Sequence, residues 1–216
     1  MPRPRFERLK KEKRERILEA AAKAFAAAGF EQASMNQILN EAGISKGAAY
    51  YYFDDKADLY VSTIQYYLAT LADSVDLSVD DLTAENFWTR LKILYLAQLQ
   101  SSYEKPWVFG VIKSAAHVSP DVLNSPGVSS YVTYFQDGIA ALLEKGQELG
   151  KVRIDLPQSL LFNLFTAVDE TADDWFLAHR DEIGSAEIEP IALQVFETLK
   201  RVVEVSGGGG AMHLSG

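Results

Sequence analysis

The chain has 216 residues, of which 48% are hydrophobic, 11% aromatic and 24% charged, which suffices for one sizeable domain or two small ones and excludes wholesale disorder. The absence of cysteine excludes a disulfide framework, a thiol nucleophile and a Cys-ligated metal site. No apolar run reaches the roughly 18–20 residues that a membrane span needs, so we expect a soluble, cytoplasmic protein with no membrane attachment.

Positive and negative charges are unevenly distributed along the chain, whose net charge is −9. Residues 1–56 carry 11 basic and 8 acidic side chains, a net charge of +3, whereas the remaining residues carry 10 basic and 22 acidic, a net charge of −12. Phosphates would attract such a basic head and repel the acidic body. The alternative is a charge-rich first helix that is merely solvated.

The N-terminal region reads as an arm followed by a long helix. Two prolines disfavour a helix start, so we expect residues 1–6 to form a flexible basic arm. Arg3 and Arg5 on this arm can reach a DNA minor groove; a disordered terminus with incidental arginines is the alternative. Apolar residues at spacings of three and four predict a helix over residues 7–28, with Gly29 as its C-cap.

Two short helices joined by a tight glycine turn follow, the pattern of a helix-turn-helix. Ser34 begins a capping-box pattern for a helix over residues 35–42, which Gly43 ends. Ser45 can cap the second helix, over residues 46–53, and the second helix of such a pair enters the DNA major groove.

On that second helix we expect Ala49, Tyr50 and Phe53 to face the core. Asp54 or Asp55 caps the next helix, with Lys56 in its first turn.

The rest of the chain also predicts helices and no strands. Thr83 can cap one of them, but Asn86 does not complete a capping box. Including the next helix, expected to begin at Lys56, the expected ranges are about residues 56–72, 83–102, 107–117, 129–149, 157–180 and 187–205. The fold class is therefore all-α, with about nine helices.

The first quarter of the chain resembles the DNA-binding signature of the TetR family of bacterial transcriptional regulators. The matching residues occur in one continuous order: Ile17-Leu18-Glu19-Ala20-Ala21, Phe25, Gly29-Phe30, Ser34, Ile38, Ala42-Gly43-Ile44-Ser45-Lys46-Gly47, Tyr50, Tyr52-Phe53, Lys56 and Leu59-Tyr60. The resemblance implies a homodimer through helices 158–180 and 187–205, a palindromic DNA operator, and repression relieved by a small-molecule effector.

The implied domain division has four parts. These are a flexible arm (1–6), a helix-turn-helix DNA-binding domain (7–55), a helical effector-binding and dimerisation domain (56–205) and a flexible glycine-rich tail (206–216).

Candidate DNA contacts combine hydroxyls, amides and cations at the ends of the short helices, where phosphates and base edges are read. They are Ser34, Asn36, Gln37, Ser45, Lys46, Gly47, Ala48, Tyr51, Tyr52 and Lys56. Family members often carry Ser or Thr at position 48 and a bulkier apolar residue at 49, whereas this chain has Ala48 and Ala49. A sensor or interaction protein of the same fold with weakened DNA binding is therefore the alternative.

The larger part of the chain is rich in aromatic residues, and a pocket among its helices is the expected effector site. Asp169 interrupts an apolar helix, and an inward-facing carboxylate needs a partner or a cationic ligand; a solvated face is the alternative. The candidate lining residues are Trp88, Tyr95, Trp107, Tyr131, Phe135, Phe165 and Asp169. Neither a metal site, a cofactor nor an enzymatic activity is expected.

Overall fold

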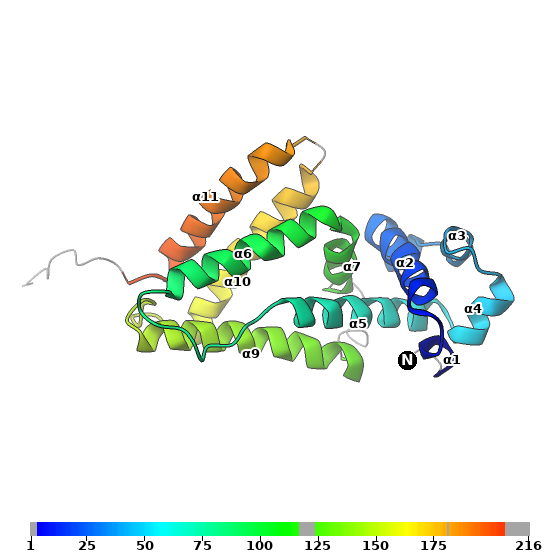
Figure 1. The fold of residues 1–216 in the computed structure, drawn as a ribbon, viewed down its shortest axis with the longest axis horizontal. Coiled ribbons are helices and arrows are strands. Elements are labelled where there is room, and N and C mark those ends of the chain that lie inside the picture. The colour runs from blue at the N-terminus through cyan, green and yellow to red at the C-terminus, as the bar shows by residue number, and fades with distance from the viewer. Residues whose placement is uncertain (1–3, 117–123, 181, 206–216) are drawn as a thin grey trace, which may run out of the picture. The chain divides into compact units, whose positions relative to one another are not determined.

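A computed structural model describes residues 4–116, 124–180 and 182–205 of the chain. Ten helices occur within these ranges and no strand does, which confirms the all-α prediction (Figure 1). Their bounds are α1 (Pro4–Glu7), α2 (Lys11–Gln32), α3 (Met35–Glu41), α4 (Lys46–Tyr52), α5 (Lys56–Ser74), α6 (Phe87–Glu104), α7 (Pro106–Ala116), α9 (Pro126–Glu148), α10 (Gln158–Ala178) and α11 (Ser185–Val203). Across the described ranges, every helix is too short or too polar to cross a membrane.

The chain forms two compact units. Unit 1 consists of residues 1–76 and 100–136, and unit 2 of residues 77–99 and 137–216. Helix α5, expected to begin the larger domain, therefore packs with the short helices of the expected DNA-binding domain. The expected glycine-rich tail lies outside the described residues.

Unit 1 is built around α2, which lies beside α5 and α7 (Figure 1). Its core contains fully buried aromatic rings, among which Phe25 and Tyr60 pack edge to face with centroids 4.7 Å apart. The Tyr60 hydroxyl lies 2.7 Å from the Ser114 hydroxyl of α7, and a methyl group on Gly110 of α7 would lie 2.7 Å from the Ala26 side chain. The alanine-rich α2 and this glycine let the two helices approach closely.

The N-terminus differs from the expected flexible arm. Residues Pro4–Glu7 form α1, and Phe6 is only 1% exposed because its ring packs against Phe53, with centroids 4.7 Å apart. A proline is compatible with the first turn of a helix, where its missing N–H is not needed. Residues 1–3 of the expected arm lie outside the described residues.

Unit 2 contains α10 and α11, which pack on each other, together with parts of α6 and α9. Its core includes Phe87, Leu161 and Val203. Ahead of α6, Asn86 Oδ1 accepts from the Thr83 backbone N–H at 2.8 Å, and Thr83 Oγ1 accepts from the Asn86 backbone N–H at 3.3 Å. Asn86 thus completes the reciprocal pair that the sequence analysis did not expect.

Candidate nucleic-acid interface

The turn between α3 and α4 is closed by backbone hydrogen bonds. Gly43 has φ +64°, a left-handed conformation that glycine adopts without strain. Its N–H donates to the Asn40 carbonyl at 3.1 Å, and the Ile44 N–H donates to the Leu39 carbonyl at 3.0 Å. These two bonds form a Schellman motif, which ends α3 and directs the chain into α4.

Side chains fix the two ends of this turn. Arg16 of α2 donates through Nε to the Ala42 carbonyl at 3.0 Å, next to the turn. Ser45 accepts from the Ala48 N–H at 3.2 Å and so caps α4 as predicted. The end of α3 is therefore tied to α2, and the first turn of α4 is held by its own cap.

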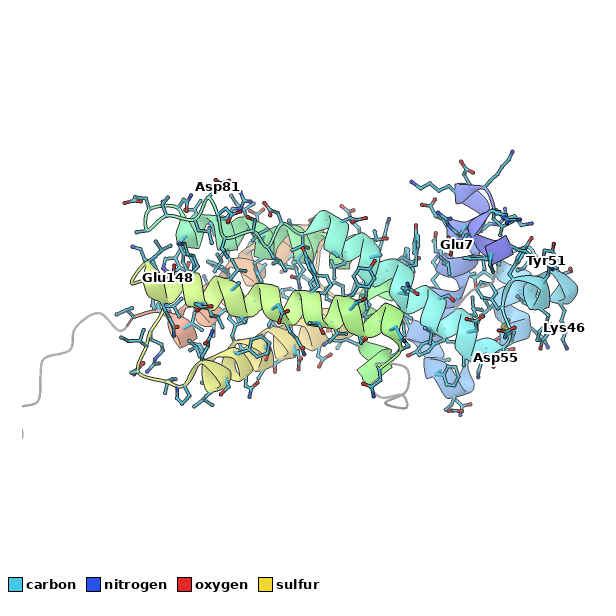
Figure 2. All side chains as sticks on the ribbon, turned by 90° about the horizontal axis from the view of Figure 1, so that it is seen from below. Glu7, Lys46, Tyr51, Asp55, Asp81 and Glu148 are labelled. Atoms are coloured by element: carbon cyan, nitrogen blue, oxygen red, sulfur yellow. The ribbon has the colours of Figure 1, made fainter. Side chains whose placement is uncertain are left out.

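The outward face of α4 consists of Lys46, Gly47, Tyr50 and Tyr51. Tyr50 and Tyr51 are 46% and 48% exposed. Lys46 forms no ion pair with any described residue, and Figure 2 shows Lys46 and Tyr51 at the outer edge of unit 1. The face thus presents one ammonium group, two exposed tyrosine side chains and a glycine at which another backbone can approach closely.

The inward face of α4 holds two of the candidate contacts. Ala48 is half-buried against the unit 1 core, and Tyr52 is 8% exposed, with its ring 6.0 Å from that of Phe6. The structure therefore does not place Ala48 and Tyr52 on the exposed surface with the other candidates.

The prediction that Tyr50 packs in the core is wrong. Ala49 is fully buried, and one turn later the buried residues are Tyr52 and Phe53. Since consecutive helical residues are about 100° apart, Tyr50 must point away from the line that joins Ala49 to Tyr52 and Phe53. Tyr50 and Tyr52 flank the Ala49 and Phe53 positions at equivalent helical angles, so spacing alone could not decide which of the two rings is buried.

Three candidate contacts lie at the start of α3. Ser34 is half-buried, and its hydroxyl accepts from the Gln37 N–H at 3.5 Å, so it caps α3 as predicted. Asn36 and Gln37 are exposed. Their side-chain amides are therefore available to an outside partner.

Lys56 has intramolecular partners that the sequence analysis did not anticipate. Its ammonium donates to the carbonyls of Glu31 and Ala33, at 3.1 and 3.3 Å, and lies 4.7 Å from the centre of the Phe30 ring. Lys56 thus joins the first turn of α5 to the end of α2 and the residue that follows it.

Three residues of the expected effector pocket belong to unit 1. Trp107, Tyr131 and Phe135 are partly buried against the unit 1 core. The Lys23 ammonium lies 4.6 Å from the centre of the Trp107 ring. Tyr131 lines a cavity of about 370 Å³ together with residues of α1, α2 and α5.

The other four residues of the expected pocket belong to unit 2. Trp88 and Phe165 pack against the unit 2 core, and Tyr95 lies 5.9 Å from Phe196. Burial raises the pKa of the Tyr95 phenol, and the carboxylates of Asp169 and Asp173 raise it further. Its hydroxyl is buried without a hydrogen-bond partner among the described residues, so at neutral pH it remains a protonated donor.

No group of three or more metal-ligating side chains is positioned to hold an ion within the described ranges.

The chain is similar to known bacterial transcriptional regulators. The family model for bacterial regulatory proteins of the tetR family matches residues 17–63, which span α2, α3, α4 and the start of α5. The HTH-type transcriptional regulator TtgW of Pseudomonas putida is 32% identical over 96 residues, which cover 44% of this chain and 69% of TtgW. The transcriptional repressor AcnR of Corynebacterium diphtheriae is 24% identical over 77% of this chain and 80% of its own. With two further regulators the alignment covers only 26% and 43% of the relative.

Among solved structures, FadR of Bacillus subtilis in complex with stearoyl-CoA superposes with a TM-score of 0.71 at 15% identity, over 88% of this chain and 99% of FadR. A likeness at this identity shows a shared fold.

Proposed function

Because the chain belongs to the tetR family of bacterial transcriptional regulators, we propose that it is a cytoplasmic repressor. In this proposal a homodimer binds a palindromic DNA operator and leaves it when a small molecule binds. The observation that carries the proposal is the outward face of α4, where a fixed turn presents Lys46, Gly47 and two exposed tyrosines.

The operator contacts are assigned to the exposed polar groups of α3 and α4. α4 enters the major groove, where Lys46 reaches a guanine edge or a phosphate and the tyrosine hydroxyls reach phosphates. The assigned set is Ser34, Asn36, Gln37, Ser45, Lys46, Gly47, Tyr50 and Tyr51. The α2–α4 region is thus the DNA-binding domain.

The structure weakens the case for the alternative, a sensor that has lost specific DNA binding. That alternative depended on Ala48 and Ala49, which carry no polar group. Ala49 is fully buried and Ala48 packs against the core, so base-reading side chains would come from other positions of α4.

Dimerisation is assigned to α10 and α11. Between them lies an open groove of about 620 Å³. Its lining is almost entirely apolar or small: Leu164, Ala167, Val168, Thr171, Ala172, Trp175, Ile191, Gln194, Val195 and Thr198. The positions recur at three- and four-residue spacing on both helices, and Leu164 and Trp175 are 38% and 41% exposed. A second copy of the same two helices would cover this stripe as a four-helix bundle.

The effector site is assigned to unit 2, around Trp88, Tyr95, Phe165 and Asp169. The aromatic rings offer an apolar wall, and the unsatisfied Tyr95 hydroxyl offers a donor to a ligand acceptor. FadR, which shares this fold, is bound to stearoyl-CoA in its solved structure. A thermal-shift screen of acyl-CoA thioesters, other apolar acids and organic cations tests the site, because a ligand of the folded state raises the melting temperature.

The central experiment is selection of a duplex from a random DNA library with the purified full chain. We expect an enriched sequence with two-fold symmetry, bound by two chains, with an affinity that falls steeply with salt. Equal binding to all duplexes, or no enrichment, would contradict the proposal.

Two variants then test the assigned face. Lys46→Ala and Tyr51→Ala are expected to weaken binding to the enriched duplex by about 5- to 100-fold each, with unchanged folding by circular dichroism. Lys92→Ala, a change of the same charge in unit 2, serves as the control. Affinities equal to wild type for both variants would favour the sensor reading.

A further inference from the structure

Helix α1 brings a basic segment against the outward-facing helix α4. Phe6 anchors α1 in the core through its contacts with Tyr52 and Phe53. Its neighbour Arg5 is exposed. Residues 4–7 therefore have a fixed position beside α4, which a flexible segment would not have.

Arg5 meets α4 at one of the assigned DNA contacts. Its guanidinium carbon lies 4.3 Å from the centre of the Tyr51 ring, within the range of a cation–π contact. Tyr51 remains 48% exposed, so the two side chains form one continuous surface. A guanidinium stacked by its face keeps the N–H donors along its edges available.

The charges around Arg5 leave it available for an anion. The acidic residue of α1, Glu7, is paired with Arg14 at 3.3 Å. Arg5 forms no ion pair with any described residue, and the same holds for Arg8 and Lys10, which are both exposed. Arg5, Arg8 and Lys10 therefore form a group of positive charges that no ion pair with a described acidic side chain neutralises.

We propose that Arg5, which lies outside the helix-turn-helix, and Tyr51 of α4 together form a phosphate-binding element for the operator backbone. The Tyr51 ring supports the guanidinium, whose edge donates to a phosphate oxygen next to the groove that α4 occupies. This inference rests on the proposed function, since it extends the DNA-binding surface to a segment that the family model does not cover.

The test compares Arg5→Ala, Arg5→Lys and the wild-type full chain on the enriched duplex at several salt concentrations. Each phosphate contact contributes about 0.9 to the slope of log affinity against log salt. We expect Arg5→Ala to lower the slope by about 0.9 per protomer and to weaken binding at least fivefold at low salt. Arg5→Lys keeps the charge and therefore the slope, but loses the stacked fork and binds with intermediate affinity.

A double-mutant cycle tests whether Arg5 depends on the ring. Tyr51→Phe retains the ring and should leave the effect of Arg5→Ala unchanged, whereas Tyr51→Ala should remove most of it. Additive effects of Arg5→Ala and Tyr51→Ala would contradict the pairing.

The experiment separates a failure of this inference from a failure of the proposed function. Lys92→Ala removes one positive charge from unit 2 and should change the slope much less than Arg5→Ala. If the wild type enriches a duplex but Arg5→Ala matches it in slope and affinity, this inference alone is overturned. If the wild type enriches no duplex, the proposed function itself fails, and the inference with it.

Discussion

The two units of this protein bury their apolar side chains to different extents. Among the described residues, the connected cluster of buried apolar side chains has 19 members in unit 1 and six in unit 2, and five more buried apolar side chains of unit 2, four of them on α11, lie outside its cluster. In α2 the buried set runs from Ile17 to Phe25, whereas in α10 only Leu161 is buried. Leu160, Leu164 and Trp175 of α10 are instead 44%, 38% and 41% exposed.

The difference follows from what each unit is proposed to contact. The helices of unit 1 bury their apolar faces against one another, and the unit presents polar and cationic groups on its surface. Such a surface suits a hydrated, charged partner such as DNA. Unit 2 leaves an apolar stripe that a single chain does not cover, which suits a second protein surface of the same kind. Each of the following substitutions changes a residue in one of the two units and tests the property proposed for that unit.

The largest expected effect is on the closed core of unit 1. Phe6→Ala removes a ring that is 1% exposed and should lower the free energy of unfolding by about 3–5 kcal/mol, because a cavity remains. Urea denaturation followed by circular dichroism measures the loss. Phe6→Leu is the control, with an expected loss below about 1.5 kcal/mol. A flexible arm at this position would instead give no measurable change for either variant.

The second prediction concerns the open face of unit 2. Leu164→Glu places a charge in the groove between α10 and α11 and should raise the dimer dissociation constant at least hundredfold, about 2.7 kcal/mol. Sedimentation equilibrium measures it. Ile93→Glu introduces the same charge at a site that is 57% exposed on α6 and outside the groove lining, and it should leave the dimer intact. Equal behaviour of the two variants would show that the groove is not the interface.

A third prediction addresses the close approach of α2 and α7. The methyl group of Gly110→Ala would lie 2.7 Å from the Ala26 side chain, so the helices must separate, at a cost of about 1–3 kcal/mol. Gly47→Ala is the matched control, because nothing lies within 4 Å of the added atom and its helical backbone favours alanine by about 0.5–1 kcal/mol. Opposite signs of the two changes in urea denaturation are expected; two equal losses would contradict the contact.

Local signals in the sequence predicted most of the helices and the caps of α3 and α4, although α1 and the end of α2 at Gln32 were not expected. Ser34 and Ser45 cap α3 and α4, Gly43 follows α3 with a positive φ angle, and Gly29 interrupts α2 with another, as their residue types indicate. Each of these features depends on residues within four or five positions. Such signals survive in a single sequence because the physical cause is local.

Features that depend on distant partners were predicted less well. Phe6 follows two prolines and looked unstructured, yet its partners lie some 46 residues further along. Lys56 looked like a phosphate ligand because its partners are carbonyl groups, which carry no side-chain signature. The aromatic residues of the expected pocket gave no indication that Trp107 and Trp88 belong to different units, since burial in either core produces the same helical spacing.

The smallest expected effect separates two lysines that the sequence alone treats alike. Lys46 is exposed on α4, whereas Lys56 donates to the carbonyls of Glu31 and Ala33, at the end of α2 and just after it. If Lys46 contacts DNA, Lys46→Met lowers the salt slope of operator binding by about 0.9 per protomer.

Lys56→Met should leave that slope nearly unchanged and should instead weaken affinity severalfold, because the start of α3 loses its tie to α5, a loss of about 1 kcal/mol in hydrogen bonding. Fluorescence anisotropy with the enriched duplex at four or more salt concentrations measures both variants. A slope that falls equally in both would place Lys56 on a phosphate after all. Lys46 would then be one of two equivalent phosphate contacts, and the operator contacts would not be concentrated on the outward face of α4.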